Sequence, residues 1–175
     1  TTIQTHAAPE LSFGSATLKP GGTASLNLTL AGGTEAYAGV NAKIFLPGEV
    51  SVTGVSPGEL LSSGNFKVDY QTFSEDANNG VTVIAYSGTD SFSTPSGILL
   101  HLNLQASDDA APGDYEVRFA TTDTGLVNSN YALSNADGTI SVSPARTTGS
   151  VIIESDDNDN DGLPDIWEQQ IIDTY

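Results

Sequence analysis

The 175-residue chain contains no cysteine and no methionine. The absence of cysteine excludes disulfide bonds, thiol catalysis and cysteine-based zinc sites, so packing alone must stabilise the fold. No apolar run approaches the roughly 20 residues that span a bilayer, and we therefore expect no membrane insertion. The polar opening, TTIQTHAAPE, lacks the basic and apolar regions of a signal peptide.

Basic residues are also scarce. Five Lys and Arg stand against 22 Asp and Glu, which gives a formal net charge of −17. Such a chain repels phosphate backbones and anionic membrane surfaces, so nucleic acid is not an expected partner. The segment from Glu154 to Tyr175 carries eight acidic residues and no basic one. We therefore treat this C-terminal segment as a separate electrostatic unit.

Residues that commonly carry catalysis are few and scattered. The sequence contains no G-x-S-x-G, H-E-x-x-H or P-loop motif. His101 lies on the polar side of an expected strand, and His6 lies in the N-terminal segment, so solvated histidines are the favoured interpretation. Carboxylate pairs such as Asp108 with Asp109 fall in turn signals. We predict a non-catalytic protein.

Short runs of alternating apolar and polar residues occupy the chain between Leu11 and Val142. This period of two is typical of half-buried β-strands, and Gly, Pro, Asn and Asp clusters separate the runs. The pattern predicts an all-β sandwich whose inward side chains fill the space between two sheets. The expected inward residues are Ala24, Leu26, Leu28, Leu30, Val40, Ala42, Ile44, Leu46, Phe66, Val68, Tyr70, Val81, Val83, Ala85, Leu100, Leu102, Leu104, Tyr115, Val117, Phe119, Ile140 and Val142.

The organisation follows from these patterns. We expect an N-terminal tail at 1–9 and one sandwich domain at 10–143. Residues 144–155 contain Pro, Thr and Ser, and we expect them to form a linker or an extra strand. Residues 156–175 form a calcium loop and the start of a short helix, in which Ile166, Trp167, Ile171 and Ile172 supply an apolar side.

A twelve-residue calcium-loop pattern, D-x-[DN]-x-[DN]-G-x5-E, occurs at 157–168 as DNDNDGLPDIWE. Calcium takes six to eight oxygen ligands, and the glycine at the sixth position, Gly162, makes the sharp turn. We expect the Asp165 carboxylate to bind the ion directly or through a water molecule. The backbone carbonyl of Leu163 and both carboxylate oxygens of Glu168 are also expected ligands. The full predicted ligand set is Asp157, Asp159, Asp161, Leu163, Asp165 and Glu168.

The alternative to a calcium site is a solvated acidic tail, because acidic and Asn-rich runs are common in linkers. A random acidic run would not also place Gly162 and Glu168 at the required positions, so we favour Ca²⁺. A single loop of modest affinity suits the millimolar calcium outside cells. We therefore expect a secreted or cell-surface location.

Several segments, in order, resemble a cohesin, the module that docks dockerin-bearing proteins. The resemblance covers most of the chain, and the SPGELL turn and the APGDYEVRF return strand are its most specific parts. It also includes LKPGGTASLNLTL, AYAGVNAKIFLPGEVSVTGVSPGELL, NFKVDYQTF, VTVIAYSG, GILLHLNLQASDDAAPGDYEVRF and ADGTISV. The third strand of cohesins usually ends in an aromatic-Asp-Pro triplet, whereas here Phe45 is followed by Leu46 and Pro47.

The resemblance implies a jelly-roll sandwich of roughly nine strands and a dockerin-like partner. It also implies that the partner contacts one sheet, around Asn41, Asp69, Ile84 and Glu116. Phe73, Ile84 and Tyr86 are apolar groups on an otherwise polar sheet face, which indicates an anchor patch; the alternative is scattered surface residues or cover from a loop. The candidate contact residues are Asn41, Lys43, Asp69, Gln71, Phe73, Ile84, Tyr86, Glu116 and Arg118.

The calcium segment resembles the loops of thrombospondin type 3 repeats and of dockerins, but it occurs here as a single copy. Our leading hypothesis is a non-catalytic docking module with a calcium-binding C-terminal junction. The alternatives are a carbohydrate-binding module and a structural stalk domain of a surface protein. Polysaccharide binding is disfavoured because the single Trp, Trp167, belongs to the calcium segment and few aromatics share one outward face.

Overall fold

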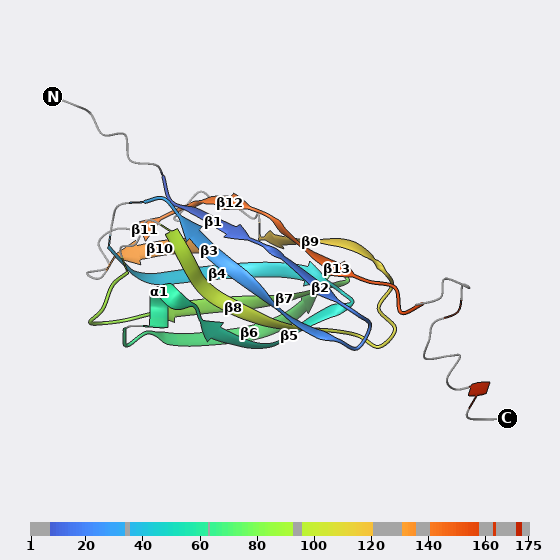
Figure 1. Ribbon diagram of the computed structural model, residues 1–175. Coiled ribbons are helices and arrows are strands. Elements are labelled where there is room, and N and C mark those ends of the chain that lie inside the picture. Colours follow the sequence, from blue (N-terminus) through green and yellow to red (C-terminus); the bar gives the residue numbers. More distant parts are fainter. Residues whose placement is uncertain are drawn as a thin grey trace.

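The structure is a computed structural model that describes residues 8–33, 36–62, 64–92, 96–120, 131–135, 141–157, 163 and 171–172. Two β-sheets pack face to face in a jelly-roll sandwich, so the predicted all-β class is confirmed (Figure 1). The first sheet has the order β12 (Ala145–Thr147), β1 (Glu10–Phe13), β3 (Thr23–Ala31), β8 (Ser96–Ala106) and β5 (Val50–Pro57).

The long strand β4 (Tyr37–Pro47) organises the second sheet. One edge of β4 pairs from Gly39 to Pro47 with β7 (Asn78–Tyr86), and β6 (Lys67–Glu75) lies beyond β7. The other edge of β4 pairs first with β10 (Tyr131–Asn135) and then with β9 (Gly113–Phe119). The sheet is completed by β11 (Ser141–Val142) beside β10, and by β13 (Gly149–Ile153) and β2 (Ser15–Leu18) beyond β9, while α1 (Glu59–Ser62) lies between β5 and β6.

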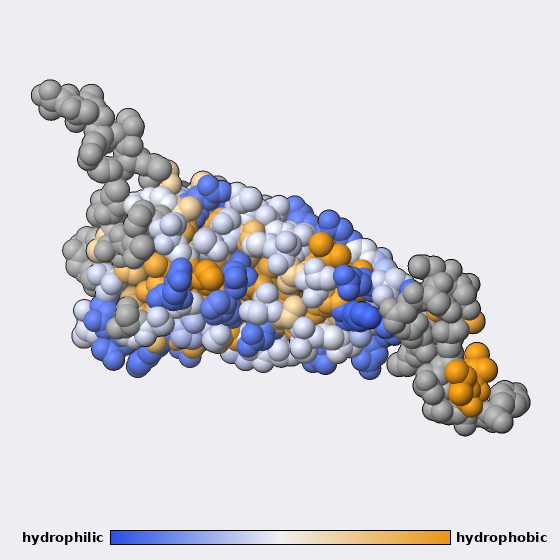
Figure 2. Space-filling model, in the orientation of Figure 1, coloured by the Kyte–Doolittle hydropathy of each residue, from blue (hydrophilic) through white to orange (hydrophobic). Residues whose placement is uncertain are grey.

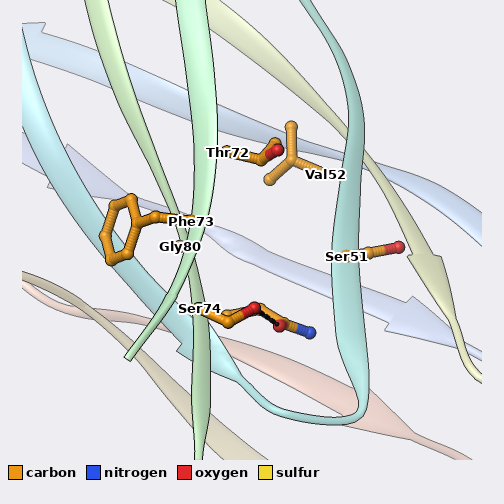
Figure 3. Close-up of a pocket in the computed structure, with 7 residues that line it drawn as sticks. Ser51, Val52, Thr72, Phe73, Ser74 and Gly80 are labelled. Carbon is orange, nitrogen blue, oxygen red and sulfur yellow. Dashed lines mark hydrogen bonds between the residues drawn. The ribbon is translucent and has the colours of Figure 1, made fainter. Parts of the chain in front are cut away.

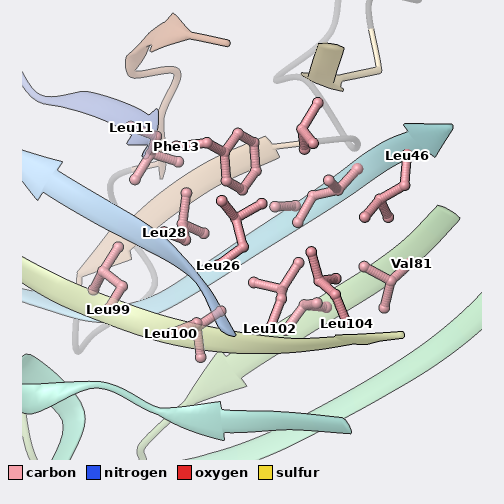
Figure 4. Packing of buried hydrophobic residues seen from close by; sticks show 14 of the residues in the cluster. Leu11, Phe13, Leu26, Leu28, Leu46, Val81, Leu99, Leu100, Leu102 and Leu104 are labelled. Carbon is pink, nitrogen blue, oxygen red and sulfur yellow. The ribbon is translucent and has the colours of Figure 1, made fainter. Parts of the chain in front are cut away.

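The core fills the space between the sheets, as the alternation predicted. Leu26, Leu28 and Leu30 of β3 are fully buried, whereas Asn27 and Thr29 between them are half-buried on the outer side. These leucines belong to one core cluster with side chains from β4 and β7, including Leu46 and Val81 (Figure 4). A strand with a period of two therefore presents one face to the core and the other to solvent.

Tyr70 was expected to lie in the core, but 44% of its surface is exposed. Tyr70 has the same parity as Val68, which packs against the core. However, β6 is the outermost strand of its sheet, and its inward side chains beyond Val68 have little of the first sheet above them. Alternation identified the side of the strand but could not show where the opposing sheet ends.

The first and last strands both change sheets midway. β1 belongs to the first sheet and β2 to the second, with Gly14 between them. β12 and β13 follow the same course, parallel to β1 and β2. The backbones are close at this crossing, because a Cβ on Gly149 would lie 2.3 Å from the Gly14 carbonyl oxygen. The segment left open as a linker or an extra strand thus contains two strands, one in each sheet.

The hairpin between β6 and β7 has a tight two-residue turn. Asp76 and Ala77 have φ values of 50° and 61°, and Glu75 pairs directly with Asn78. Two consecutive left-handed residues match the right-handed twist of the flanking strands. Consequently Asn78, Asn79 and Gly80 lie inside β7, although they form one of the Asn- and Gly-containing clusters that are expected to separate the strands.

Candidate functional site

The candidate docking face is the outer surface of β9, β4, β7 and β6. Strand register aligns its outward side chains in rows across the sheet, because alternate residues share one face. One row joins Asn41, Ile84 and Asp69, and the next joins Lys43, Thr82 and Gln71. A further row continues from Phe73 through Gly80 and Phe45 to Arg118. The structure therefore brings the predicted contact residues of β4, β6 and β7, with Arg118, onto one surface.

Two large side chains stand out from the β7 part of this face. Ile84 is 46% exposed and Tyr86 is 43% exposed. Their neighbours in register, Asp69 and Lys67 of β6, are also exposed. An apolar pair within a polar surround is the usual composition of a small protein-binding patch.

The end of the face near the β6–β7 turn carries two packed phenylalanines. The rings of Phe45 and Phe73 meet edge to face, with centroids 5.4 Å apart and an interplanar angle of 88°. Gly80 makes room for this arrangement, because a Cβ at that position would lie 2.2 Å from Cζ of Phe73. Edge-to-face contact favours the attraction between the positive edge of one ring and the negative face of the other.

Two cations lie over these rings. Lys43 Nζ is 4.7 Å from the Phe73 centroid and 3.0 Å from Glu75 Oε2, so it bridges the aromatic pair and the neighbouring carboxylate. The guanidinium carbon of Arg118 is 4.6 Å from the Phe45 centroid. Cation–π contact holds both side chains near the sheet. We call Lys43, Phe45, Phe73, Glu75 and Arg118 the cation–aromatic cluster.

The charge of this face differs from that of the chain. Lys43, Lys67 and Arg118 are three of the five basic residues in the sequence. The same four strands carry four outward acidic residues, Asp69, Glu75, Asp114 and Glu116. The face is therefore close to neutral, although the chain has a net charge of −17. This surface would repel an acidic partner less than the rest of the molecule would.

Shallow hollows flank the Lys43–Glu75 bridge. One has a volume of about 360 Å³ and lies between β4, β6 and β7. Another has a volume of about 190 Å³ and is lined by Lys43, Phe45, Glu75, Asp76, Asn78, Arg118 and Ala120. Both open onto the candidate docking face, so the cluster forms a ridge between two depressions.

A third hollow, of about 290 Å³, lies between β5 and the β6–β7 hairpin at the side of the sandwich (Figure 3). Val52 faces Thr72 across it, whereas the Ser51 side chain points away from the hairpin, and Ser74 Oγ donates to Asn79 Oδ1 at 2.9 Å. None of its lining residues, which are completed by Phe73 and Gly80, is acidic or basic. The chemistry of this hollow is that of a small polar groove, without an acid, a base or a strong nucleophile.

The loop after β7 is held by Asp90. Its carboxylate Oδ2 accepts hydrogen bonds from Asn65 N at 2.8 Å, from Asn65 Nδ2 at 3.1 Å and from Thr89 Oγ1 at 3.1 Å. These donors favour the ionised form, and the backbone hydrogen bond from Asn65 contributes most to lowering the pKa of Asp90. The contact ties this loop to the start of β6, next to Tyr86 on the candidate docking face.

Phe45 is one of the residues of this face that the sequence-based set of contacts omitted; the others are Lys67, Glu75, Thr82 and Asp114. Phe45 follows Lys43 at the same parity, so the alternation of Val40, Ala42 and Ile44 already assigned it to the outer side. Conversely, Glu116 is exposed and lies in a part of β9 that pairs with β13 rather than with β4. Its predicted contact role stays a prediction, as do the roles of the other residues in the set.

The opposite face, formed by β3, β5 and β8, has another character. These three strands contain no Asp, Glu, Lys or Arg. His101 lies here, with Nδ1 2.7 Å from Asn27 Oδ1. Figure 2 views the molecule from the side of β3 and β8, where hydrophilic and near-neutral residues cover most of the surface. His6 lies outside the described residues.

Most of the predicted calcium ligands also lie outside the described residues, namely Asp159, Asp161, Asp165 and Glu168. Asp157 is half-buried, and its backbone N donates to Ser155 Oγ at 3.2 Å. Leu163 is 40% exposed. Within the described part of the chain, no three acidic or histidine side chains gather closely enough to hold a metal ion. The predicted ligands offer oxygen alone, which is the donor chemistry that calcium requires.

Comparison with solved structures identifies the fold. A non-cellulosomal cohesin from Archaeoglobus fulgidus matches with a TM-score of 0.62 and 18% identity, over 85% of this chain and 93% of its own. A chain of a type I cohesin–dockerin complex from Clostridium thermocellum matches with a TM-score of 0.64 and 17% identity, over 84% and 99%. The seventh type I cohesin of ScaB from Pseudobacteroides cellulosolvens matches with a TM-score of 0.64 and 13% identity, over 89% and 99%.

No protein-family model matches the chain, and no curated protein sequence matches it. The structural similarity is nevertheless extensive, because each cohesin matches over nearly its whole length. The chain therefore has the two-sheet jelly-roll fold of cohesin modules. Within the described residues, no helix is both long and apolar enough to cross a membrane.

Proposed function

We propose that this chain is a non-catalytic docking module that binds a dockerin-type partner through the candidate docking face. The observation that carries the proposal is the exposed pair Ile84 and Tyr86 on a nearly neutral face of an acidic molecule. Such a patch offers apolar anchors inside a polar rim, which is how most binding energy is concentrated at interfaces. The cohesin fold supports the partner class, since several of the similar structures are complexes with dockerins.

Isothermal titration against the dockerin modules encoded in the same genome tests this proposal. We expect one of them to bind with one-to-one stoichiometry. Replacing Tyr86 and Phe73 with alanine should abolish that binding, whereas Asn103→Ala on the opposite face should leave it unchanged. If every dockerin fails to bind the folded protein, the proposal is wrong.

A carbohydrate-binding function would need a row of exposed aromatic rings that stack on sugars. The rings of Phe45 and Phe73 instead pack against each other and beneath two cations. No outward aromatic residue is present on β3, β5 or β8. We therefore favour protein docking, and a glycan array supplies the matching control.

The proposal includes a calcium-binding junction at residues 157–168 in a secreted or cell-surface protein. Its support is the loop pattern and the all-oxygen donor set. Bound calcium would neutralise carboxylates that otherwise repel one another and would order the segment that follows the sandwich. The residues that would hold it are Asp157, Asp159, Asp161, Asp165 and Glu168, together with the carbonyl of Leu163.

Calcium titration should show about one site, which Asp161→Ala or Glu168→Ala should weaken severely. Limited proteolysis supplies an independent readout. Cleavage within 154–175 should be faster with EGTA than with calcium, whereas cleavage elsewhere should not change. Equal cleavage rates under both conditions would contradict a structural role for the ion.

A further inference from the structure

Arg118 has an unusual environment for a basic residue in an acidic chain. Its guanidinium lies over the ring of Phe45, 4.6 Å from the centroid. Within the described part of the chain, it makes no ion pair, although 22 acidic residues are available in the sequence. Lys43, the neighbouring cation, is already paired with Glu75 at 3.0 Å. Arg118 is thus the cation of the cluster whose charge has no carboxylate partner among the described residues.

A cation–π contact leaves the hydrogen-bonding chemistry of a guanidinium available. The N–H donors of this planar group lie in its plane and point away from its edges. These donors match the two oxygens of a carboxylate in a bidentate contact. Because Phe45 limits the motion of the side chain, little further conformational entropy is lost when a carboxylate binds.

The surroundings provide space for such a group. The 190 Å³ hollow beside Arg118 is lined by Phe45, Ala120 and the Lys43–Glu75 bridge. Asp76 and Asn78 complete the lining. Glu75 is neutralised by Lys43, which leaves Asp76 as the carboxylate at the rim that opposes an incoming anion. The two cations and two anions make this hollow far less repulsive than the chain as a whole.

We propose that Arg118, held on the ring of Phe45, is a preformed receptor for a carboxylate side chain of the docking partner. The inference rests on the proposed function, because it assigns one polar contact of the same face. It also predicts the partner's chemistry: an Asp or Glu of the partner lies opposite the row formed by Phe73, Gly80, Phe45 and Arg118. The Ile84 and Tyr86 part of the face would receive apolar side chains.

The carboxylate receptor can be tested without a partner, by using acetate as the probe. Sodium acetate replaces sodium chloride at constant ionic strength while the arginine Nε–Hε signals of ¹⁵N-labelled protein are recorded. The sequence contains two arginines, and Arg118→Lys identifies which signal belongs to Arg118. Arg146, which donates from Nη1 to the Ala120 carbonyl at 3.3 Å, serves as the internal reference.

We expect the Arg118 signal to shift and saturate at about 10–100 mM acetate, a range that suits a single charge-assisted contact. The Arg146 signal should shift less and without saturation. Phe45→Leu should raise the half-saturating concentration about threefold or more, because it removes the surface that holds the guanidinium. Dispersed amide signals must show that this variant is folded; Phe45→Tyr, which keeps the ring, is its matched control and should bind like the wild type.

Equal, unsaturated shifts of both arginines would overturn the inference, and so would unchanged saturation in folded Phe45→Leu. These outcomes differ from failure of the proposed function. Acetate binding without any dockerin binding would retain the receptor and refute docking. Dockerin binding without acetate binding would retain docking and refute the receptor.

Discussion

The two outer faces of the sandwich are built on the same alternation but carry different chemistry. On β3, β5 and β8 the outward residues are neutral and polar, and neighbouring side chains satisfy one another through contacts such as His101 with Asn27. On β9, β4, β7 and β6, charges of both signs surround exposed Ile84 and Tyr86. Both faces cover the same core. The proposed docking function therefore rests on the second face, where exposed apolar side chains lie among charges of both signs.

The largest expected effect comes from placing a charge among the apolar anchors. Ile84→Asp should weaken the binding of a dockerin that binds the wild type by at least about 30-fold, because a central anchor is lost and a carboxylate is desolvated. Asn103→Asp adds the same charge to the opposite face and should change affinity less than about twofold. Titration calorimetry on both variants checks this. Equal losses would show that net charge, rather than the face, controls binding.

The next effect concerns stability, and each face offers a glycine for comparison. Gly80→Ala should destabilise the fold by about 1–3 kcal/mol, because the new Cβ would lie 2.2 Å from Phe73 Cζ and 2.7 Å from the Ile44 carbonyl oxygen. Gly54→Ala on β5 would meet Asn103 Nδ2 at 3.2 Å, a contact that a rotation of the side chain relieves. Its cost should stay below about 0.5 kcal/mol. Thermal denaturation measures both, and similar melting temperatures would contradict the packing around Phe73.

A smaller effect is expected from the Lys43–Glu75 pair, since its two side chains are 30% and 53% exposed. A double-mutant cycle with Lys43→Ala and Glu75→Ala should give a coupling free energy of about 0.2–1 kcal/mol. High salt should reduce this value by screening the charges. On the opposite face, Thr53 Oγ1 donates to the Asn103 carbonyl at 3.2 Å, and the cost of Thr53→Val should not depend on salt. Salt-independent coupling of Lys43 and Glu75 would argue against an electrostatic contact.

The smallest effect concerns the loop that leaves the Tyr86 end of the face. The folded-state pKa of Asp90 is lowered, so its carboxylate contributes stability above the unfolded-state pKa, near 3.8. That contribution is lost as the pH falls from there through the folded-state pKa. Asp90→Asn should therefore be less stable than the wild type at neutral pH, and the difference in melting temperature should narrow in acid. A constant difference down to pH 2 or so would show that ionisation is not involved.

Much of the fold could be predicted because core strands carry a strong signal. In β3, β7 and β8 most inward residues follow one another at a period of two, and the structure buries the leucines and valines among them as expected. β12 carries no such signal, because Ala145, Arg146 and Thr147 are all exposed. Its place depends on backbone pairing with β1, which leaves no trace in the pattern of side chains. The segment 144–155 could therefore not be assigned from the sequence.

The candidate docking face could likewise be predicted only in part from the sequence. Parity alone places Lys43, Phe73 and Ile84 on an outward side, but only the register shows which of them are neighbours. The contact of Phe45 with Phe73 joins residues on two strands that are separated by β7, across the gap that Gly80 leaves. The hairpin turn at Asp76 and Ala77 sets that register. The sequence also contains an Asn-Gly pair, Asn79 and Gly80, which is the usual signal for a two-residue hairpin turn. A turn at that pair would give a different register and hence a different set of neighbours.

The parallel pairing of β12 with β1 and of β13 with β2 also determines where a label or a solid support can be attached to the module. Glu10 pairs with Ala145 at one pole of the sandwich, and Leu18 pairs with Ile153 at the other. The chain thus enters and leaves at opposite poles, while the candidate docking face lies along the flank (Figure 1). A fluorophore or a solid support linked at either pole would leave that flank accessible. Trimming the chain after Val142, in contrast, would remove one strand from each sheet and leave new edges unpaired.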